Sequence, residues 1–117
     1  FDDTAKSLAS GEVHQNASTS GSICDALLAI RPGKLTLPIL RQMAVEGAQV
    51  SDGQVIQAMK CALDDLGLVV EPGGAAAMAA AMNSTHSKQR TSLVVVSGSN
   101  IDPDLARRVA DLEMRDA

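Results

Sequence analysis

The chain has 117 residues, a net charge of −4 at neutral pH and a hydrophobic content of 45%, values typical of one folded domain with a core. The acidic balance and the single aromatic residue, Phe1, argue against nucleic-acid partners, because those partners require cations and stacking rings. No apolar run is long enough to cross a membrane, and no basic cluster favours an anionic membrane surface.

The N-terminal part predicts a short polar helix followed by a long polar loop. Residues 2–10 are typical of a helix that Gly11 ends. Residues 11–21 are polar or small, and a surface loop of this length suits a binding role or a lid.

Two further helices are predicted before the middle of the chain. Apolar residues at helical spacing indicate one over 22–30, which the Arg31-Pro32-Gly33 sequence ends. The next begins at Leu37-Pro38, and Gly47 is expected to close it.

The clearest helix begins after Ser51, which forms a capping box with Gln54. Four apolar residues keep one face of this helix at the expected spacing until Gly67: Val55, Met59, Leu63 and Leu66. The later stretch Ala75–Met82 consists almost wholly of alanine and methionine. A helix without a polar face is expected to be buried, with Met78 and Met82 filling gaps in the core.

The C-terminal part predicts a strand, a small polar loop and a helix. Leu93–Val96 is a continuous apolar run rich in β-branched residues, typical of a parallel strand buried on both faces. The small residues Ser97–Asn100 follow, and Asp102-Pro103 then opens a helix with Leu105, Val109 and Leu112 on its inner face. This unit commonly places ligands at the carboxyl end of an α/β sheet.

Two loops are candidates for chemistry, Glu71–Gly74 and Ser97–Asn100. Each follows an apolar extended segment and leads toward a helix, so both could line one pocket. The residues alone favour simpler roles, a helix-end charge for Glu71 and a turn serine for Ser97. Ser97 is no nucleophile elbow, because the Gly-x-Ser-x-Gly frame is absent.

The cysteines and histidines show no pattern of a metal or nucleophile site. Cys24 and Cys61 fit no zinc or redox spacing and are interpreted as small buried residues of a cytoplasmic protein. His14 and His86 lie in polar loops, where solvated rings are expected.

Four stretches carry a family resemblance: Ser22–Leu27, Pro32–Ile39, Glu71–Ala75 and Val95–Asp102. In this order and at this spacing they resemble the threonine/serine dehydratase family. These are pyridoxal-phosphate (PLP) enzymes of fold type II, a group that also includes serine racemase and hydroxyaspartate dehydratases. The resemblance implies that residues 1–117 are the C-terminal segment of such a catalytic domain.

The implied fold class is α/β. The chain would be the C-terminal part of the large PLP-binding domain of a tryptophan synthase β-like enzyme, mostly helices packed on short parallel strands. The implied function is part of a hydroxy amino acid dehydratase, which eliminates water from L-threonine or L-serine to give a 2-oxo acid and ammonia. A serine racemase, a hydroxyaspartate dehydratase or a non-catalytic α/β binding or oligomerisation module remain alternatives.

The resemblance also implies roles for individual residues. Ser97 matches the serine whose hydroxyl hydrogen-bonds the cofactor's pyridine nitrogen. A hydroxyl leaves the ring nearly neutral, which suits a reaction in which a β-hydroxyl leaves promptly, whereas an aspartate would hold the ring protonated. Gly98 and Asn100 continue this frame, although Ser99 replaces a usual glycine. Glu71 matches a glutamate near the pocket floor with a supporting role.

Two further positions in the first half of the chain match the family. Asp25 and Ala26 stand where the family commonly has Asp-Gly lining the cofactor pocket. Asp3 resembles an acidic position that helps to hold a divalent cation, Mg²⁺ or Ca²⁺, while a plain helix-start aspartate is equally consistent.

No catalytic residue is assigned within this segment. In the family the Schiff-base lysine and the glycine-rich phosphate loop lie upstream of the matched stretches. The lysines of this chain match no such motif and are interpreted as surface residues: Lys6, Lys34, Lys60 and Lys88. The expected partners are a small hydroxy amino acid and further copies of the full-length enzyme in a homo-oligomer.

Overall fold

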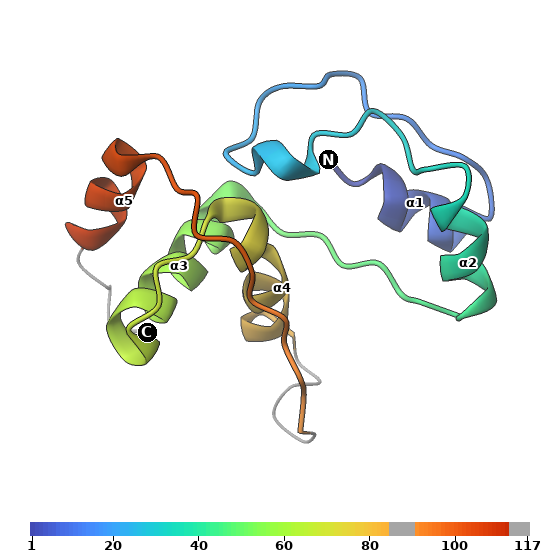
Figure 1. Ribbon diagram of the computed structural model, residues 1–117. Helices are drawn as coiled ribbons and strands as arrows, with labels where there is room; N and C mark the ends of the chain where they lie inside the picture. The colour runs from blue at the N-terminus through green and yellow to red at the C-terminus, as the bar shows by residue number, and fades with distance from the viewer. Residues whose placement is uncertain (85–90, 113–117) are drawn as a thin grey trace. The chain divides into compact units, whose positions relative to one another are not determined.

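A computed structural model describes residues 1–84 and 91–112, so His86 and Lys88 lie outside the described residues (Figure 1). The chain divides into two compact units, residues 1–49 and 50–117. No helix in the described ranges is long and apolar enough to span a membrane. The elements are α1 (Asp3–Ser10), η1 (Asp25–Leu27), α2 (Thr36–Gln42), α3 (Asp52–Leu66), α4 (Pro72–Met82) and α5 (Pro103–Ala110).

The first unit is built on α1, which begins and ends as predicted. Gly11 ends the helix in the left-handed conformation, with φ 78°. On the buried side of α1, the Ser7 hydroxyl donates to the Asp3 carbonyl at 2.6 Å and accepts from the His14 amide at 2.8 Å. The Arg41 guanidinium of α2 donates to the Ser7 carbonyl at 3.0 Å, which joins the two helices.

The predicted helix over 22–30 is wrong, because only the short 3₁₀ turn η1 forms there. Side chains in this stretch bind nearby backbone amides instead. The Cys24 amide donates to the Ser22 hydroxyl at 3.1 Å, and the Ala26 amide donates to the Asp25 carboxylate at 2.8 Å. Such local bonds compete with a regular helix.

The end of α2 is also different from the prediction. Ala44, not Gly47, adopts the left-handed conformation, with φ 51°. Its amide donates to the Arg41 carbonyl at 3.0 Å, and the Val45 amide donates to the Leu40 carbonyl at 3.1 Å. These two bonds form a Schellman motif with an alanine at the position that usually holds glycine.

Gly47 has a packing role instead of closing the helix. A Cβ at this position would lie 2.5 Å from the Ala5 Cα and 2.6 Å from its Cβ. Only a glycine therefore lets the segment after α2 pass this close to α1.

We expect Ala44→Gly to stabilise the protein by about 1 kcal/mol, because glycine adopts positive φ without the penalty that an L side chain carries there. Ala77→Gly is the matched control. Ala77 is exposed within α4, so the same substitution there should destabilise by about 1 kcal/mol. Thermal unfolding of both variants tests the prediction, and an unchanged or lower midpoint for Ala44→Gly would contradict it.

The second unit is organised around the packing of α3 against α4 (Figure 1). Its core is formed by buried residues of both helices: Val55, Ala58, Met59, Ala62, Ala75 and Ala79. The alanines among them allow the two helices to approach closely. The predicted capping box is confirmed, since the Gln54 amide donates to the Ser51 hydroxyl and the Ser51 amide donates to the Gln54 side chain. Gly67 ends α3 in the left-handed conformation, also as predicted.

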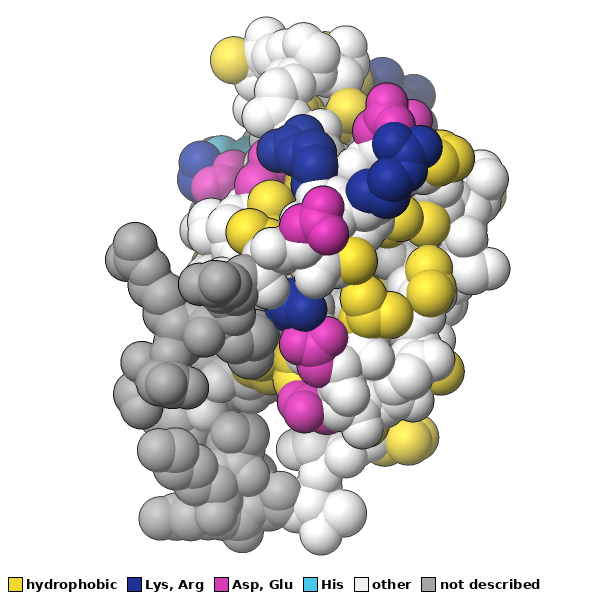
Figure 2. Space-filling model, turned by 90° about the vertical axis from the view of Figure 1, so that its left-hand side faces the viewer, with side chains coloured by type: hydrophobic (Ala, Val, Ile, Leu, Met, Phe, Trp, Pro, Cys, Tyr) yellow, Lys and Arg dark blue, Asp and Glu magenta, His cyan; other side chains and the backbone are white. Residues whose placement is uncertain are grey.

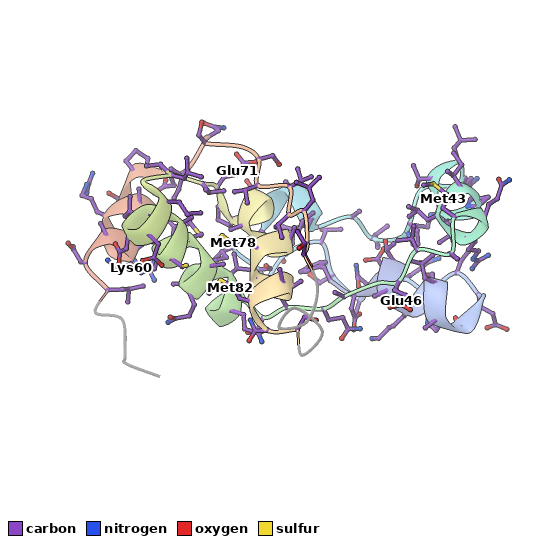
Figure 3. All side chains as sticks on the ribbon, turned by 90° about the horizontal axis from the view of Figure 1, so that it is seen from below. Met43, Glu46, Lys60, Glu71, Met78 and Met82 are labelled. Atoms are coloured by element: carbon purple, nitrogen blue, oxygen red, sulfur yellow. The ribbon has the colours of Figure 1, made fainter. Side chains whose placement is uncertain are left out.

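The predicted full burial of the alanine-methionine helix is wrong for this chain. One face of α4 contacts α3, while Ala77 is exposed and Met82 is 47% exposed. Met82 therefore fills no gap in the core (Figure 3). Leu66, expected on the inner face of α3, is also exposed.

Lys60 is buried, which corrects its interpretation as a surface lysine. Its ammonium donates to the Asp64 carboxylate at 2.9 Å and to the Ala110 carbonyl at 3.1 Å (Figure 3). Ala110 is the last residue of α5, where a cation is favourable because the helix end carries partial negative charge. At the other end of α5, Asp102 caps the helix as predicted, accepting from the Asp104 and Leu105 amides.

The predicted buried strand is not formed among the described residues, which contain helices and extended segments but no paired strand. Residues 91–101 run in an extended path past α4 (Figure 1). Leu93 is 95% exposed and Val95 70% exposed, and the backbone hydrogen bond that holds this segment lies further along, between the Glu71 amide and the Gly98 carbonyl. Figure 2 shows one face of the molecule, on which hydrophobic side chains are exposed between acidic and basic ones.

Neither cysteine forms a disulfide, and only one of them is buried. Cys24 is buried as predicted, whereas Cys61 is partly exposed on α3. The Cys61 thiol donates to the Asp65 carboxylate at 3.0 Å. This hydrogen bond raises the pKa of the Cys61 thiol, and desolvation adds in the same direction.

Because a raised pKa leaves less thiolate at a given pH, Cys61 should react slowly with iodoacetamide near pH 8. Asp65→Asn should lower the pKa and speed the reaction, with the rate rising at lower pH than in the unchanged protein. Peptide mapping of the alkylated protein separates Cys61 from Cys24. Asp104→Asn serves as the control, because the Asp104 carboxylate binds Arg107 and not a cysteine. Equal effects of Asp65→Asn and Asp104→Asn on the alkylation rate of Cys61 would contradict the prediction.

Candidate functional site

The site begins where the chain enters α4. Glu71 precedes the helix in an extended conformation, and Pro72 occupies the first helical position, where its missing N–H is not needed. The Glu71 side chain forms no cap on its own helix. Its carboxylate is therefore available for contacts outside α4 (Figure 3).

Two hydrogen bonds join Glu71 to the loop that comes after residues 91–96. The Glu71 amide donates to the Gly98 carbonyl at 3.0 Å. The Asn100 amide donates to the Glu71 Oε2 atom at 3.2 Å. The two loops predicted as candidates for chemistry thus lie together, and they are held through backbone groups of the loop 97–100, called the serine loop below.

Two glycines permit this close contact. Gly98 has φ 79°, and a Cβ there would overlap the Glu71 carboxyl group. A Cβ on Gly74 would overlap the Ser97 carbonyl oxygen. The first turn of α4 and the serine loop therefore approach each other through positions that have no side chain.

The serine loop forms part of a surface pocket of about 250 Å³. The pocket lies within the second unit and is lined by Leu68, Val69, Val70, Val96, Ser97, Gly98 and Ser99. Its walls are mostly aliphatic, and Ser97 is exposed. An apolar pocket with a few hydroxyl and backbone groups can hold a flat ring and bind one polar atom of it.

The other predicted pocket residues belong to the first unit, so they are described separately from this site. Asp25 and Ala26 form the start of η1 and are exposed. The Asp25 carboxylate accepts from the Ala26 amide of the same turn.

The predicted metal position, Asp3, is buried in α1. Its carboxylate accepts from the Asn16 amide group at 2.6 Å and from the Thr4 hydroxyl at 3.3 Å. The neighbouring Asp2 pairs with Lys6 at 2.9 Å, and this hydrogen bond lowers the pKa of Asp2. Over residues 1–84 and 91–112 no three acidic, histidine or cysteine side chains come together as a metal site would require.

Gly74 is a residue of the site to which sequence reasoning gave no role, although the loop that contains it was a candidate. A glycine inside an otherwise alanine-rich helix is costly, by about 1 kcal/mol relative to alanine. That cost was a signal that another part of the backbone approaches Gly74 closely. In the structure the Ser97 carbonyl makes this approach.

Comparison with known proteins identifies the family. Residues 1–98 match the family described as pyridoxal-phosphate dependent enzyme, so the chain belongs to this family. A serine racemase of Oryza sativa subsp. indica is 36% identical over 108 residues, covering 86% of this chain and 31% of that protein.

Solved structures of the same kind match the fold. The maize serine racemase matches with a TM-score of 0.78 and 31% identity, covering 93% of this chain and 34% of that chain. The T.th. threonine deaminase matches with a TM-score of 0.75 and 29% identity, over 86% of this chain and 37% of that chain. The chain thus spans about a third of the length of these relatives.

The described residues around Ser97 fit the ring of pyridoxal phosphate, the cofactor that the family implies. An exposed serine at the rim of an aliphatic pocket can hydrogen-bond a ring nitrogen, and the pocket walls can contact the ring. Lys60 is not suited to attach the cofactor, because its ammonium already binds Asp64 and the Ala110 carbonyl.

We expect Gly98→Ala to displace the Glu71 carboxylate and loosen the serine loop, because the new Cβ would occupy the carboxylate's place. Gly11→Ala is the matched control. Gly11 has nearly the same φ, 78°, but a Cβ there would meet no atom within 4 Å, so the variant carries the backbone strain alone, about 1–2 kcal/mol.

Amide hydrogen exchange measures the effect locally. The Glu71 amide, which is bonded to the Gly98 carbonyl, should lose protection in Gly98→Ala and keep it in Gly11→Ala. Equal protection of the Glu71 amide in both variants would show that the contact does not hold the loop.

Proposed function

We propose that this chain is part of a PLP-dependent hydroxy amino acid dehydratase that converts L-threonine or L-serine to a 2-oxo acid and ammonia. The observation that carries the proposal is that Ser97, exposed and in a loop held by Glu71, lines a mostly aliphatic pocket. Membership of the PLP family and the fold shared with a threonine deaminase support it. The order of the four matched stretches favours placement in the C-terminal part of the enzyme.

In this proposal the residues of the chain position the cofactor rather than react with the substrate. PLP supplies the electron sink for breaking bonds at the substrate's α-carbon. The Ser97 hydroxyl would donate to the pyridine nitrogen, and the aliphatic walls would exclude water from the ring face. Glu71, Gly98 and Asn100 would fix the hydroxyl in place. Asp25 and Ala26 would contribute to the same pocket, and the attaching lysine would come from another part of the polypeptide.

Serine racemase is the second candidate, because the rice and maize proteins of that name match this chain at 36% and 31% identity. Both reactions begin at the same substrate carbon and differ in their later steps. A neutral pyridine ring favours prompt loss of a β-hydroxyl over a long-lived carbanion, so the serine at position 97 favours the dehydratase as the first candidate.

We also infer the wider setting of the enzyme. A small hydroxy amino acid is the expected substrate, and the full-length protein is expected to be a cytoplasmic homo-oligomer. A divalent cation near Asp3 remains part of the proposal, with further oxygen ligands from elsewhere in the polypeptide.

The polypeptide that contains this chain, purified with PLP, provides the test. Ser97→Ala should weaken PLP binding about fivefold or more in an absorbance titration, because one hydrogen bond to the ring is lost. Release of 2-oxo acid from L-threonine and L-serine should fall in parallel. Ser92→Ala, an exposed serine of the same segment outside the pocket, should change neither value.

Chiral chromatography of the products from L-serine separates the two candidates. Predominant 2-oxo acid supports the dehydratase, whereas predominant D-serine supports the racemase. Unchanged PLP affinity in Ser97→Ala would contradict the role proposed for Ser97 in either enzyme.

A further inference from the structure

The first unit contains a second and larger pocket, of about 430 Å³, that the proposed function does not use. Three of its lining side chains are basic and none is acidic. The pocket is lined by Val13, Gln15, Arg31, Pro32, Gly33, Lys34, Leu37, Pro38 and Arg41. Its volume lies in the range of small-molecule sites, about 300–1,000 Å³.

The basic side chains are not neutralised by acidic groups within the described part of the chain. Three ion pairs join described residues, and none of them includes Arg31, Lys34 or Arg41. Three cations around one hollow, without a described acidic partner, are unexpected in a chain whose net charge is −4. Three exposed cations that line one hollow offer charge-assisted hydrogen bonds to an anionic ligand.

The pocket's frame is fixed by hydrogen bonds. The Asn16 amide donates to the Ile30 carbonyl at 2.8 Å, which ties the residue before Arg31 to the residue after Gln15, and Arg31 and Gln15 both line the pocket. The Leu37 amide donates to the Gly33 carbonyl at 3.1 Å, which holds the loop against α2. The Arg41 guanidinium is oriented by its bond to the Ser7 carbonyl and keeps further donors for a ligand.

The remaining lining is aliphatic. Val13, Leu37 and the two prolines offer contact area but no aromatic ring, so they suit a hydrocarbon or sugar-like body better than a stacked base. Gln15 adds an amide that can donate or accept.

From these observations we infer that the pocket binds a phosphorylated small molecule. Two arginine guanidinium groups and a lysine ammonium can donate hydrogen bonds to phosphate oxygens. Their positive charges complement a phosphate ester, which carries a charge of about −1.5 to −2 at neutral pH. The site is separate from the pocket at Ser97 and does not depend on the function proposed for that pocket.

Calorimetric titration with inorganic pyrophosphate tests the charge of the site. The protein is loaded with PLP first, so that the probe does not report on the cofactor pocket, and unbound PLP is removed by desalting because its phosphate could occupy the proposed site. Arg31→Gln and Lys34→Gln should each weaken pyrophosphate binding about tenfold, because each removes one charge-assisted contact. Lys6→Gln, which removes a cation of the same unit that pairs with Asp2 outside the pocket, should leave the affinity unchanged.

Two results would overturn the inference: no measurable binding of pyrophosphate, or equal losses of affinity in Lys6→Gln and in the pocket variants. Thermal unfolding of each variant confirms that it is folded. Titration with butyl phosphate and inorganic phosphate tests the aliphatic walls. Butyl phosphate should bind at least about fivefold more tightly, and equal affinities would overturn the assignment of an organic phosphate.

Discussion

The hydrogen bonds between Glu71 and the serine loop are the contacts on which the second unit's site depends. The Glu71 amide binds the Gly98 carbonyl, and its carboxylate accepts from the Asn100 amide. These bonds attach an extended segment, which no strand supports among the described residues, to the first turn of α4. Because α4 is packed against α3, the position of the loop is set by the helix pair.

The same contact explains why small residues are concentrated at this point. Gly98 leaves room for a carboxylate, and Gly74 leaves room for a carbonyl oxygen. Alanines on α3 and α4 allow the two helices to pack closely without large side chains. The result is a pocket whose walls are aliphatic and whose hydroxyl group, on Ser97, is carried by a loop with fixed backbone contacts.

Much of this arrangement was predictable from the sequence, because it depends on local chemistry. The capping box at Ser51, the cap at Asp102 and the helix end at Gly11 arise from interactions within a few residues. The two loops at Glu71 and Ser97 were predicted to line one pocket, from their similar positions after apolar segments. They are in contact, but only the serine loop lines the pocket.

The errors arose where contacts distant in sequence decide the outcome. Lys60 is buried because the end of α5 lies beside it, 50 positions along the chain, and no local pattern shows this. Gly47 is needed because the chain passes close to Ala5 there. The Schellman motif that ends α2 has Ala44, and not Gly47, in the left-handed conformation. The apolar run at Leu93 was correctly predicted as extended, but a strand also needs a neighbouring backbone, which a single segment's sequence cannot supply.

A crystal structure of the PLP-bound polypeptide that contains this chain would test the central claim most directly. The account predicts the Ser97 Oγ atom within hydrogen-bonding distance, about 2.7–3.2 Å, of the pyridine nitrogen, with Glu71 bound to the loop. A cofactor whose ring nitrogen faces a different residue, or which lies away from this loop, would contradict it.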